Sequence, residues 1–286
     1  MRRFTLEAPD GLETALRLMS GDPEIRPFAG GTDLMVLLES GKLPPGRYVS
    51  IWGFNELRGI TVTPDRVSLG ALTTYRDVLS HPVFRSEFPL LCAAARQTGG
   101  IATQNRGTLG GNIANASPAA DSPPALLVYD AELELRSIGR VRHVAYDRFH
   151  TGYKSMDLAP GEIISHIHLP RRQPTWRQTY RKVGTRNAQA ISKVCLAAAV
   201  DLDGNRVRDA RVALGSVAPM VVRCVHVEAA LRDRIQDGEL PSVVSAALAH
   251  DITPIDDLRS TARYRVRVAE NLLIQFLTEA LHGRSH

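Results

Sequence analysis

One stretch of the chain, residues 106–121, limits most strongly what the chain can fold into. It reads RGTLGGNIANASPAAD and offers only Leu109 and Ile113 as side chains with much apolar area to bury. A packed helix or strand needs such area. Paired glycines instead let a backbone lie close against another group, because no Cβ keeps that group away. The stretch therefore predicts a close approach of the backbone to a neighbouring group.

A second glycine pair lies in the segment PFAGGTDL at 27–34. It follows a predicted strand at 25–29, and Thr32 and Asp33 stand where the N-cap of the next helix belongs. Consecutive N–H groups in such turns form a nest for anions, to which a helix N-terminus adds a favourable dipole. Two such turns could hold the two phosphates of a dinucleotide from opposite sides. Tight turns without any ligand are the alternative explanation.

The predicted elements divide the chain into three packed regions, with a boundary at 170–174. An opening series of strand, helix, strand, helix and strand indicates an α/β unit with a largely buried sheet. Hairpins and helices follow, and the last region shows three alternating strands and then helices, ending in a long helix near 260–282. We therefore expect an α+β fold with regions at 1–55, 56–172 and 175–286.

The composition argues against several classes of protein. The hydrophobic fraction of 44% and the charged fraction of 23% are those of an ordinary globular domain. No apolar run has the length of a membrane span, and the first residues lack the pattern of a secretory signal, so we expect a cytoplasmic protein. The formal charge is +5, but the arginines are scattered and the aromatic fraction is 6%, which argues against nucleic-acid binding. An arginine-rich surface suits acidic protein partners or phosphates.

The three cysteines, Cys92, Cys195 and Cys224, are far apart and have apolar neighbours in the sequence. We interpret them as buried free thiols, which fits a reducing compartment. Their odd number and the lack of a C-x-x-C motif argue against a metal or cluster site made by this chain alone.

Familiar catalytic and nucleotide motifs are missing from the sequence. Neither G-x-G-x-x-G, nor the P-loop, nor HExxH, nor G-x-S-x-G occurs, and no pair of nucleophile and base can be named. We therefore predict no catalytic residue, and a bound cofactor would carry any redox chemistry.

Two patterns have some likeness to metal sites. His166 and His168 share a face of a predicted strand, but no third ligand lies near them in the sequence, so we interpret them as strand residues at a surface. The run DLDGNR at 201–206 is similar to a calcium loop, but Val212 stands where a bidentate glutamate is needed. We interpret this run as a hairpin turn at Asp203–Gly204.

Three segments together resemble the FAD-binding subunit of the molybdenum hydroxylase family, which includes bacterial xanthine, carbon monoxide and nicotine-type dehydrogenases. They read PFAGGTDLM, TQNRGTLGGNIANASPAADSPPALLVYDAELEL and YRKVGTRNAQAISKV. Their order and spacing match the family, and the likeness covers nearly the whole chain. It implies the FAD-binding fold of the vanillyl-alcohol oxidase type, with two α/β subdomains and FAD between them. A C-terminal domain with a three-stranded antiparallel sheet and helices would follow.

The same resemblance implies a cofactor and partners. FAD would be non-covalent, since neither glycine motif offers a cysteine or histidine. A large subunit would hold the molybdenum cofactor, and a small subunit would hold [2Fe–2S] clusters; this chain would bind no metal. FAD would pass electrons to NAD, oxygen or a quinone, and two heterotrimers would form a dimer. A self-sufficient flavin oxidoreductase of the same fold, or a scaffold that has lost FAD, are the alternatives.

The family motifs also imply roles for individual residues. One side of the diphosphate would be held by Pro27, Phe28, Ala29, Gly30, Gly31, Thr32, Asp33 and Leu34. The other side would be held by Thr108, Leu109, Gly110, Gly111 and Asn112, with the N–H groups of the two glycines directed at FAD oxygens. Thr103 and the backbone of Ile164 would lie near the flavin, Asp121 would bond ribityl or ribose hydroxyls, and Lys182 would direct a cation to the N1–C2=O edge of the ring.

Overall fold

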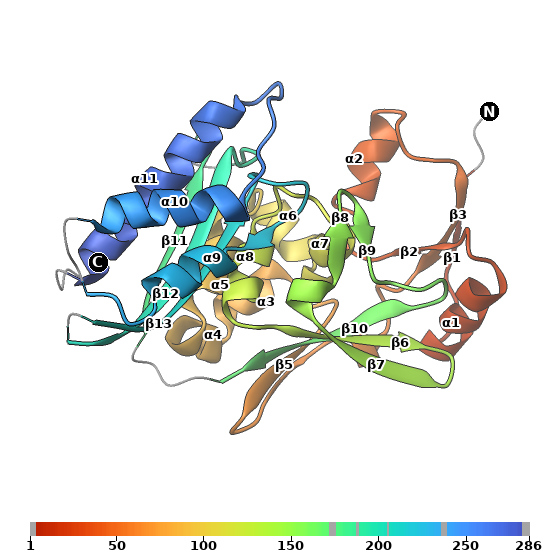
Figure 1. Ribbon diagram of the computed structural model, residues 1–286. Helices are drawn as coiled ribbons and strands as arrows, with labels where there is room; N and C mark the ends of the chain where they lie inside the picture. The colour runs from red at the N-terminus through yellow and green to blue at the C-terminus, as the bar shows by residue number, and fades with distance from the viewer. Residues whose placement is uncertain (1–3, 172–175, 187–188, 205, 236–238, 282–286) are drawn as a thin grey trace.

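The strands form sheets that follow one another along the chain, with helices packed on each (Figure 1). This arrangement comes from a computed structural model that describes residues 4–171, 176–186, 189–204, 206–235 and 239–281. Figure 1 shows the N-terminal sheet at one end of the molecule, the C-terminal sheet at the other, and α7 between them.

The N-terminal sheet is parallel, with the order β1-β3-β2. Its elements are β1 (Phe4–Glu7), α1 (Leu12–Gly21), β2 (Arg26–Phe28), α2 (Leu34–Glu39) and β3 (Gly46–Ser50), which confirms the predicted series. Helix α1 buries apolar residues at helical spacing and shares a core with Val49 of β3. The expectation of a largely buried sheet is wrong, because β1 is an edge strand and Leu6 is 57% exposed.

The middle sheet has the order β4-β5-β10-β6-β7 and is antiparallel throughout. Its strands are β4 (Ile60–Val62), β5 (Arg66–Gly70), β6 (Glu132–Ser137), β7 (Arg140–Ala145) and β10 (Ile163–Pro170). Both predicted hairpins are confirmed, since Val62 pairs with Val67 and Ser137 with Arg140. Apolar residues alternate along these strands, so one face enters the core and the other carries polar side chains.

The helices of this region share a core with the apolar face of this sheet, apart from the helix at 101–106, which buries no residue. They are α3 (Tyr75–Ser80), α4 (Pro82–Glu87), α5 (Pro89–Gln97), α6 (Ile101–Arg106), α7 (Leu109–Ala114) and α8 (Ser122–Val128). Short elements complete the region: η1 (Asn55–Leu57), η2 (Tyr146–Arg148), β8 (His150–Gly152) and β9 (Ser155–Met156). The sequence did not indicate α4, α6, α7, β8 or β9, because six-residue helices and two- or three-residue strands carry too few periodic positions.

The C-terminal sheet has the order β11-β12-β13-β14. Its elements are β11 (Arg177–Val183), β12 (Val194–Asp203), β13 (Arg206–Gly215), β14 (Val222–Arg223), α9 (Val225–Leu231), α10 (Leu240–Asp251) and α11 (Ala262–Leu281). The three predicted strands are confirmed, and the two-residue β14 is added to them. Asp203 pairs with Arg206, so the run at 201–206 makes the hairpin connection predicted for it.

Both faces of strand β12 are buried, which explains its almost continuous apolar sequence. Val194, Leu196 and Ala198 face the cluster formed with α9, α10 and α11, whereas Ala197 and Ala199 join the cluster of the middle region. The middle and C-terminal regions therefore share a core, and the division at 1–55, 56–172 and 175–286 remains a prediction.

Two predictions from composition can be compared with this fold. The three cysteines are buried and free, as predicted. Among the described helices, none combines the length and the apolar character needed to cross a membrane.

Candidate cofactor-binding site

The two glycine motifs lie against each other, backbone to backbone. A Cβ added to Gly30 would lie only 1.8 Å from the carbonyl oxygen of Arg106 and 3.5 Å from the nitrogen of Gly107. No other residue type leaves room for this contact, since real Cβ atoms do not approach so closely. The close approach predicted for residues 106–121 is therefore made, in part, to the first glycine turn.

The first turn presents a row of open amides. Within the described part of the chain, the N–H groups of Gly30, Gly31, Thr32 and Asp33 have no hydrogen-bond acceptor. Gly31 has a φ of +76°, a conformation that favours glycine, and packs against the ring of Phe28 from β2. Successive N–H groups in such a turn suit an anion.

The second motif is helical, and its amides have partners within the protein. The hydroxyl of Thr108 caps α7 by accepting from the N–H of Gly111 at 3.1 Å. The N–H of Leu109 donates to the carbonyl of Thr73, and that of Gly110 to the carbonyl of Ala71, each at 2.9 Å. The amides of Gly110 and Gly111 thus have acceptors within the protein, and their direction at FAD oxygens stays a prediction.

Packing explains why position 110 is a glycine. A Cβ at Gly110 would lie 2.6 Å from the Cβ of Ala71, so its absence lets α7 lie against the end of β5. Leu109 is fully buried in the same core. These two residues shape the wall of the site through packing.

A polar link joins the first turn to the end of α7. Asn115 donates from Nδ2 to Oδ1 of Asp33 at 3.3 Å, and Lys154 donates from Nζ to the carbonyl oxygen of Asn115 at 2.6 Å. Partial burial lowers the pKa of Lys154. Sequence reasoning missed Lys154, because nothing in a single lysine between β8 and β9 shows that it meets residue 115.

Asp121, at the N-cap of α8, and Lys182 of β11 form a buried ion pair. Lys182 donates from Nζ to Oδ2 of Asp121 at 2.7 Å and to the carbonyl of Gln97 at 3.1 Å. The second carboxylate oxygen, Oδ1, is buried without a hydrogen-bond partner among the described residues. Burial raises the pKa of Asp121 to about 6, although Lys182 acts in the opposite direction. Lys182 thus holds Asp121 here, where the sequence had suggested a direct approach to the flavin.

The remaining predicted residues surround these groups. Asn112 accepts at Oδ1 from the hydroxyl of Ser122, next to Asp121, at 2.6 Å. Thr103 lies on α6, where its carbonyl accepts from the N–H of Gly107. Ile164 is buried in β10 opposite Leu135, and α7 packs on that strand. Pro27 belongs to β2, while Ala29 and Leu34 flank the open amides.

His166 and His168 of β10 were predicted to lie at a surface, and the structure agrees for only one of them. His168 is only 5% exposed, so the description of both as surface residues is wrong for His168. Strands β6 and β7 bring Glu132 and His143 next to it, although both are distant from it in sequence.

The fold and these groups are those of a flavoprotein that binds a nucleotide cofactor. An FAD fits two features of the described chain: the open amides of the first glycine turn, and the buried Oδ1 of Asp121, which can accept from a hydroxyl. Comparisons with known proteins agree with this class.

Two family models cover most of the chain. Residues 2–172 match the FAD binding domain in molybdopterin dehydrogenase, and residues 178–280 match the CO dehydrogenase flavoprotein C-terminal domain. The chain is 31% identical to the xanthine dehydrogenase FAD-binding subunit of Escherichia coli O157:H7, over 94% of this chain and 93% of that protein. It is also 31% identical to the glyceraldehyde dehydrogenase medium chain of Sulfolobus acidocaldarius, over 96% and 98% of the two chains.

A solved structure gives the same result. The carbon monoxide dehydrogenase of Hydrogenophaga pseudoflava, in a form that lacks the Mo-pyranopterin moiety, contains a chain that superposes with a TM-score of 0.89. The identity is 28%, with 98% of this chain and 96% of that chain covered. The chain belongs to the family of FAD-binding subunits of molybdenum hydroxylases. This confirms the resemblance, the fold class, FAD as cofactor and an oxidoreductase of the xanthine dehydrogenase kind.

Proposed function

We propose that this chain is the electron-transfer subunit of a cytoplasmic molybdenum hydroxylase complex. It would receive electrons from [2Fe–2S] clusters of a small partner subunit and pass them through FAD to NAD, oxygen or a quinone. A large subunit would hold the molybdenum cofactor, and two heterotrimers would associate. The observation that carries the proposal is the backbone contact between the two glycine turns, beside four open amides, in a chain of this family.

Different residues would bind different parts of FAD. The open amides at 30–33 would bind the diphosphate, with Pro27, Phe28, Ala29 and Leu34 fixing the turn. Oδ1 of Asp121 would accept from a ribityl or ribose hydroxyl, and Lys182 would keep that carboxylate charged and in place. Thr108, Leu109, Gly110, Gly111 and Asn112 would form the opposite wall, with Thr103 and Ile164 beside the flavin. FAD, when bound, supplies the electron transfer.

Native mass measurement of the complex from its own host tests the proposal. We expect three different chains, one FAD for each copy of this chain, and a flavin that heat or acid releases intact. The 31.3 kDa chain found only by itself would contradict the assignment. Turnover of an organic donor by the isolated chain would instead identify a self-sufficient oxidoreductase, and a colourless chain that ignores added FAD would identify a scaffold.

A further inference from the structure

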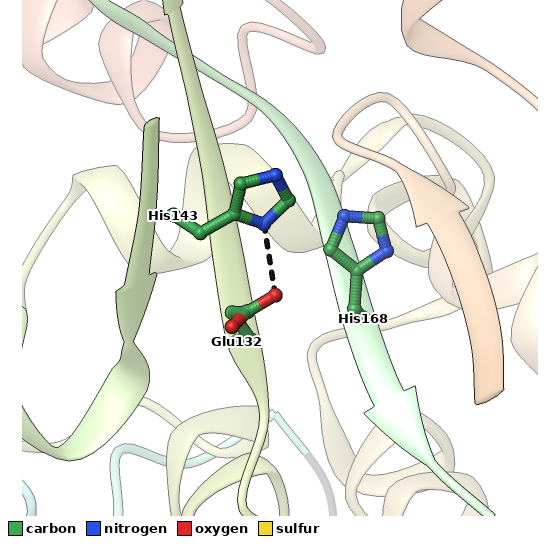
Figure 2. A group of neighbouring side chains, drawn as sticks. All are labelled: Glu132, His143 and His168. Carbon is green, nitrogen blue, oxygen red and sulfur yellow. Dashed lines mark hydrogen bonds and ion pairs between the residues drawn. The ribbon is translucent and has the colours of Figure 1, made fainter. Parts of the chain in front are cut away.

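The polar face of the middle sheet gathers histidines and glutamates from neighbouring strands. Ligand atoms of Glu132, His143 and His168 all lie within 4.8 Å of one another. The antiparallel register explains the grouping, because His168 of β10 pairs with Glu132 of β6, and Glu134 of β6 pairs with His143 of β7. Side chains of paired residues point to the same face of a sheet. Figure 2 shows the three side chains directed toward one another.

His168 has an unused and buried ring nitrogen. Its side chain is 7% exposed, and its Nδ1 lies 2.8 Å from the hydroxyl oxygen of Ser68 on β5. Its Nε2 is buried and has no hydrogen-bond partner among the described residues. When Nδ1 donates to the serine, Nε2 carries a lone pair, and the ring is fixed in the orientation that a metal ligand needs.

The other two groups can complete a site without disturbing the core. Nδ1 of His143 lies 2.8 Å from Oε1 of Glu132, and the two side chains are 41% and 46% exposed, so both have room to rotate. The rings of His143 and His168 are stacked at 5.4 Å (Figure 2). Two imidazoles and one carboxylate are ligands that Zn²⁺ and its neighbours in the first transition row prefer.

Charges around the group favour a cation on balance. Oε2 of Glu134 lies 3.8 Å from Nε2 of His168, so a second carboxylate is close enough to assist. His166 bonds this same glutamate through Nδ1 at 3.0 Å, and Ser165 donates its hydroxyl to it. Arg66 on β5 is an opposing positive charge near His168, as are His143 and His166 when they are protonated.

We propose that this face of the sheet binds one divalent first-row transition cation, with Zn²⁺ as the preferred ion, through Nε2 of His168, His143 and Glu132. The ion would join β10, β6 and β7 on the face opposite the core. Three protein ligands leave a fourth position for water or for Glu134. The site is independent of FAD, so it does not depend on the function proposed above.

Competition with a chromophoric chelator tests the proposal on the full, FAD-loaded chain after treatment with EDTA. When Zn²⁺ is then added, we expect the wild-type chain to take up one Zn²⁺ in competition with the chelator, and the His143→Ala variant to bind it at least about 10-fold more weakly, since even outer-shell changes cost 10- to 100-fold. His168→Gln should act in the same direction. His226→Ala is the matched control, because that exposed histidine also bonds a single carboxylate, Asp251, at 2.7 Å.

The stability of the variants separates a metal site from a structural role. Zn²⁺ should raise the melting temperature of the wild-type chain and of His226→Ala, but not that of His143→Ala. Loss of all Zn²⁺ from the wild-type chain to the chelator would overturn the proposal. Equal affinity in the His143 and His226 variants would also overturn it. His143 is half exposed, so its variant tests the site even if His168→Gln does not fold.

Discussion

Lys182 donates to Asp121 at 2.7 Å and thereby connects strand β11 of the C-terminal sheet to the start of helix α8. Of the two carboxylate oxygens, Oδ2 accepts this hydrogen bond. Because both side chains are about nine-tenths buried, the other oxygen has lost its water without gaining a protein donor in the described chain. A hydrogen bond from a ligand hydroxyl would satisfy this buried oxygen, which is why we propose that a sugar or ribityl hydroxyl of FAD binds there.

The first prediction concerns the pH dependence of stability in the FAD-free chain. Burial raises the pKa of Asp121 to about 6 from 3.8, so the folded state holds a proton that the unfolded state releases. The contribution of the Asp121 proton to the free energy of unfolding is fully present below about pH 4 and is lost as the pH rises through about 6. We expect the free energy of unfolding of the wild-type chain, relative to Asp121→Asn, to fall by about 1–3 kcal/mol over this range.

Urea unfolding of both proteins at several pH values measures this difference. The comparison with Asp121→Asn removes the contributions of other carboxyl groups, such as Glu162, whose pKa is lowered by Arg142. Parallel curves for the two proteins would show that Asp121 does not carry the pH dependence.

The second prediction concerns the contact between the glycine turns. Gly30→Ala should force the turn away from Arg106, since the new Cβ would lie 1.8 Å from a carbonyl oxygen. We expect FAD affinity to fall at least about 10-fold, which corresponds to about 1.4 kcal/mol. Gly53→Ala is the matched control, because a Cβ there would meet nothing within 4 Å. Fluorescence titration with FAD measures both, and equal affinities would mean that the contact has no part in binding.

The sequence allowed the glycine turns and most long elements to be predicted, for reasons that individual residues show. Strand β12 is apolar over nearly its whole length, and α1 buries residues at 12, 15, 16 and 19, so period and length identified both. The paired glycines in residues 106–121 indicated a close approach of the backbone, because a missing Cβ permits one, and Arg106 makes part of it with Gly30. These signals lie within short stretches of sequence and do not depend on which other segment of the chain packs against them.

What the sequence left hidden depends on contacts between distant segments. Leu109, Gly110 and Gly111 looked like an exposed phosphate turn, yet α7 forms because Thr108 caps it and Ala71 and Thr73 accept its first amides. The grouping of His168 with Glu132 and His143 likewise follows from strand register alone. No spacing along the chain indicated it.

The third prediction concerns an arginine that pairs with a buried glutamate. Arg142 of β7 bonds Glu162 at 2.7 Å and Asp157 at 2.9 Å, and the side chain of Glu162 is only 5% exposed. Arg142→Met would leave the buried Glu162 carboxylate without its cation, so we expect a loss of about 3 kcal/mol in unfolding free energy. Arg17→Met, which breaks an exposed pair with Glu13, should cost less than about 0.5 kcal/mol. Equal melting temperatures for the two variants would contradict this expectation.

The last prediction concerns Lys154, which the sequence did not suggest. Its Nζ atom is held by both the carbonyl and the side-chain oxygen of Asn115, at 2.6 and 2.5 Å, and Asn115 in turn bonds Asp33. This places a positive charge beside the turn whose amides are open. The diphosphate of FAD is an anion, so a fixed cation close to it should strengthen binding through partly screened attraction.

We therefore expect Lys154→Met to weaken FAD binding about 10-fold, a loss of about 1.4 kcal/mol, and to make the affinity less sensitive to salt. Lys154→Arg keeps the charge and should restore most of the affinity, which separates electrostatics from loss of the bond to Asn115. Lys42→Met removes an exposed lysine from the loop after α2 and serves as the control. FAD titrations at low and high ionic strength measure all four proteins. If Lys154→Met matches Lys42→Met at both salt concentrations, the cation does not act on the diphosphate, and the open amides alone would hold it.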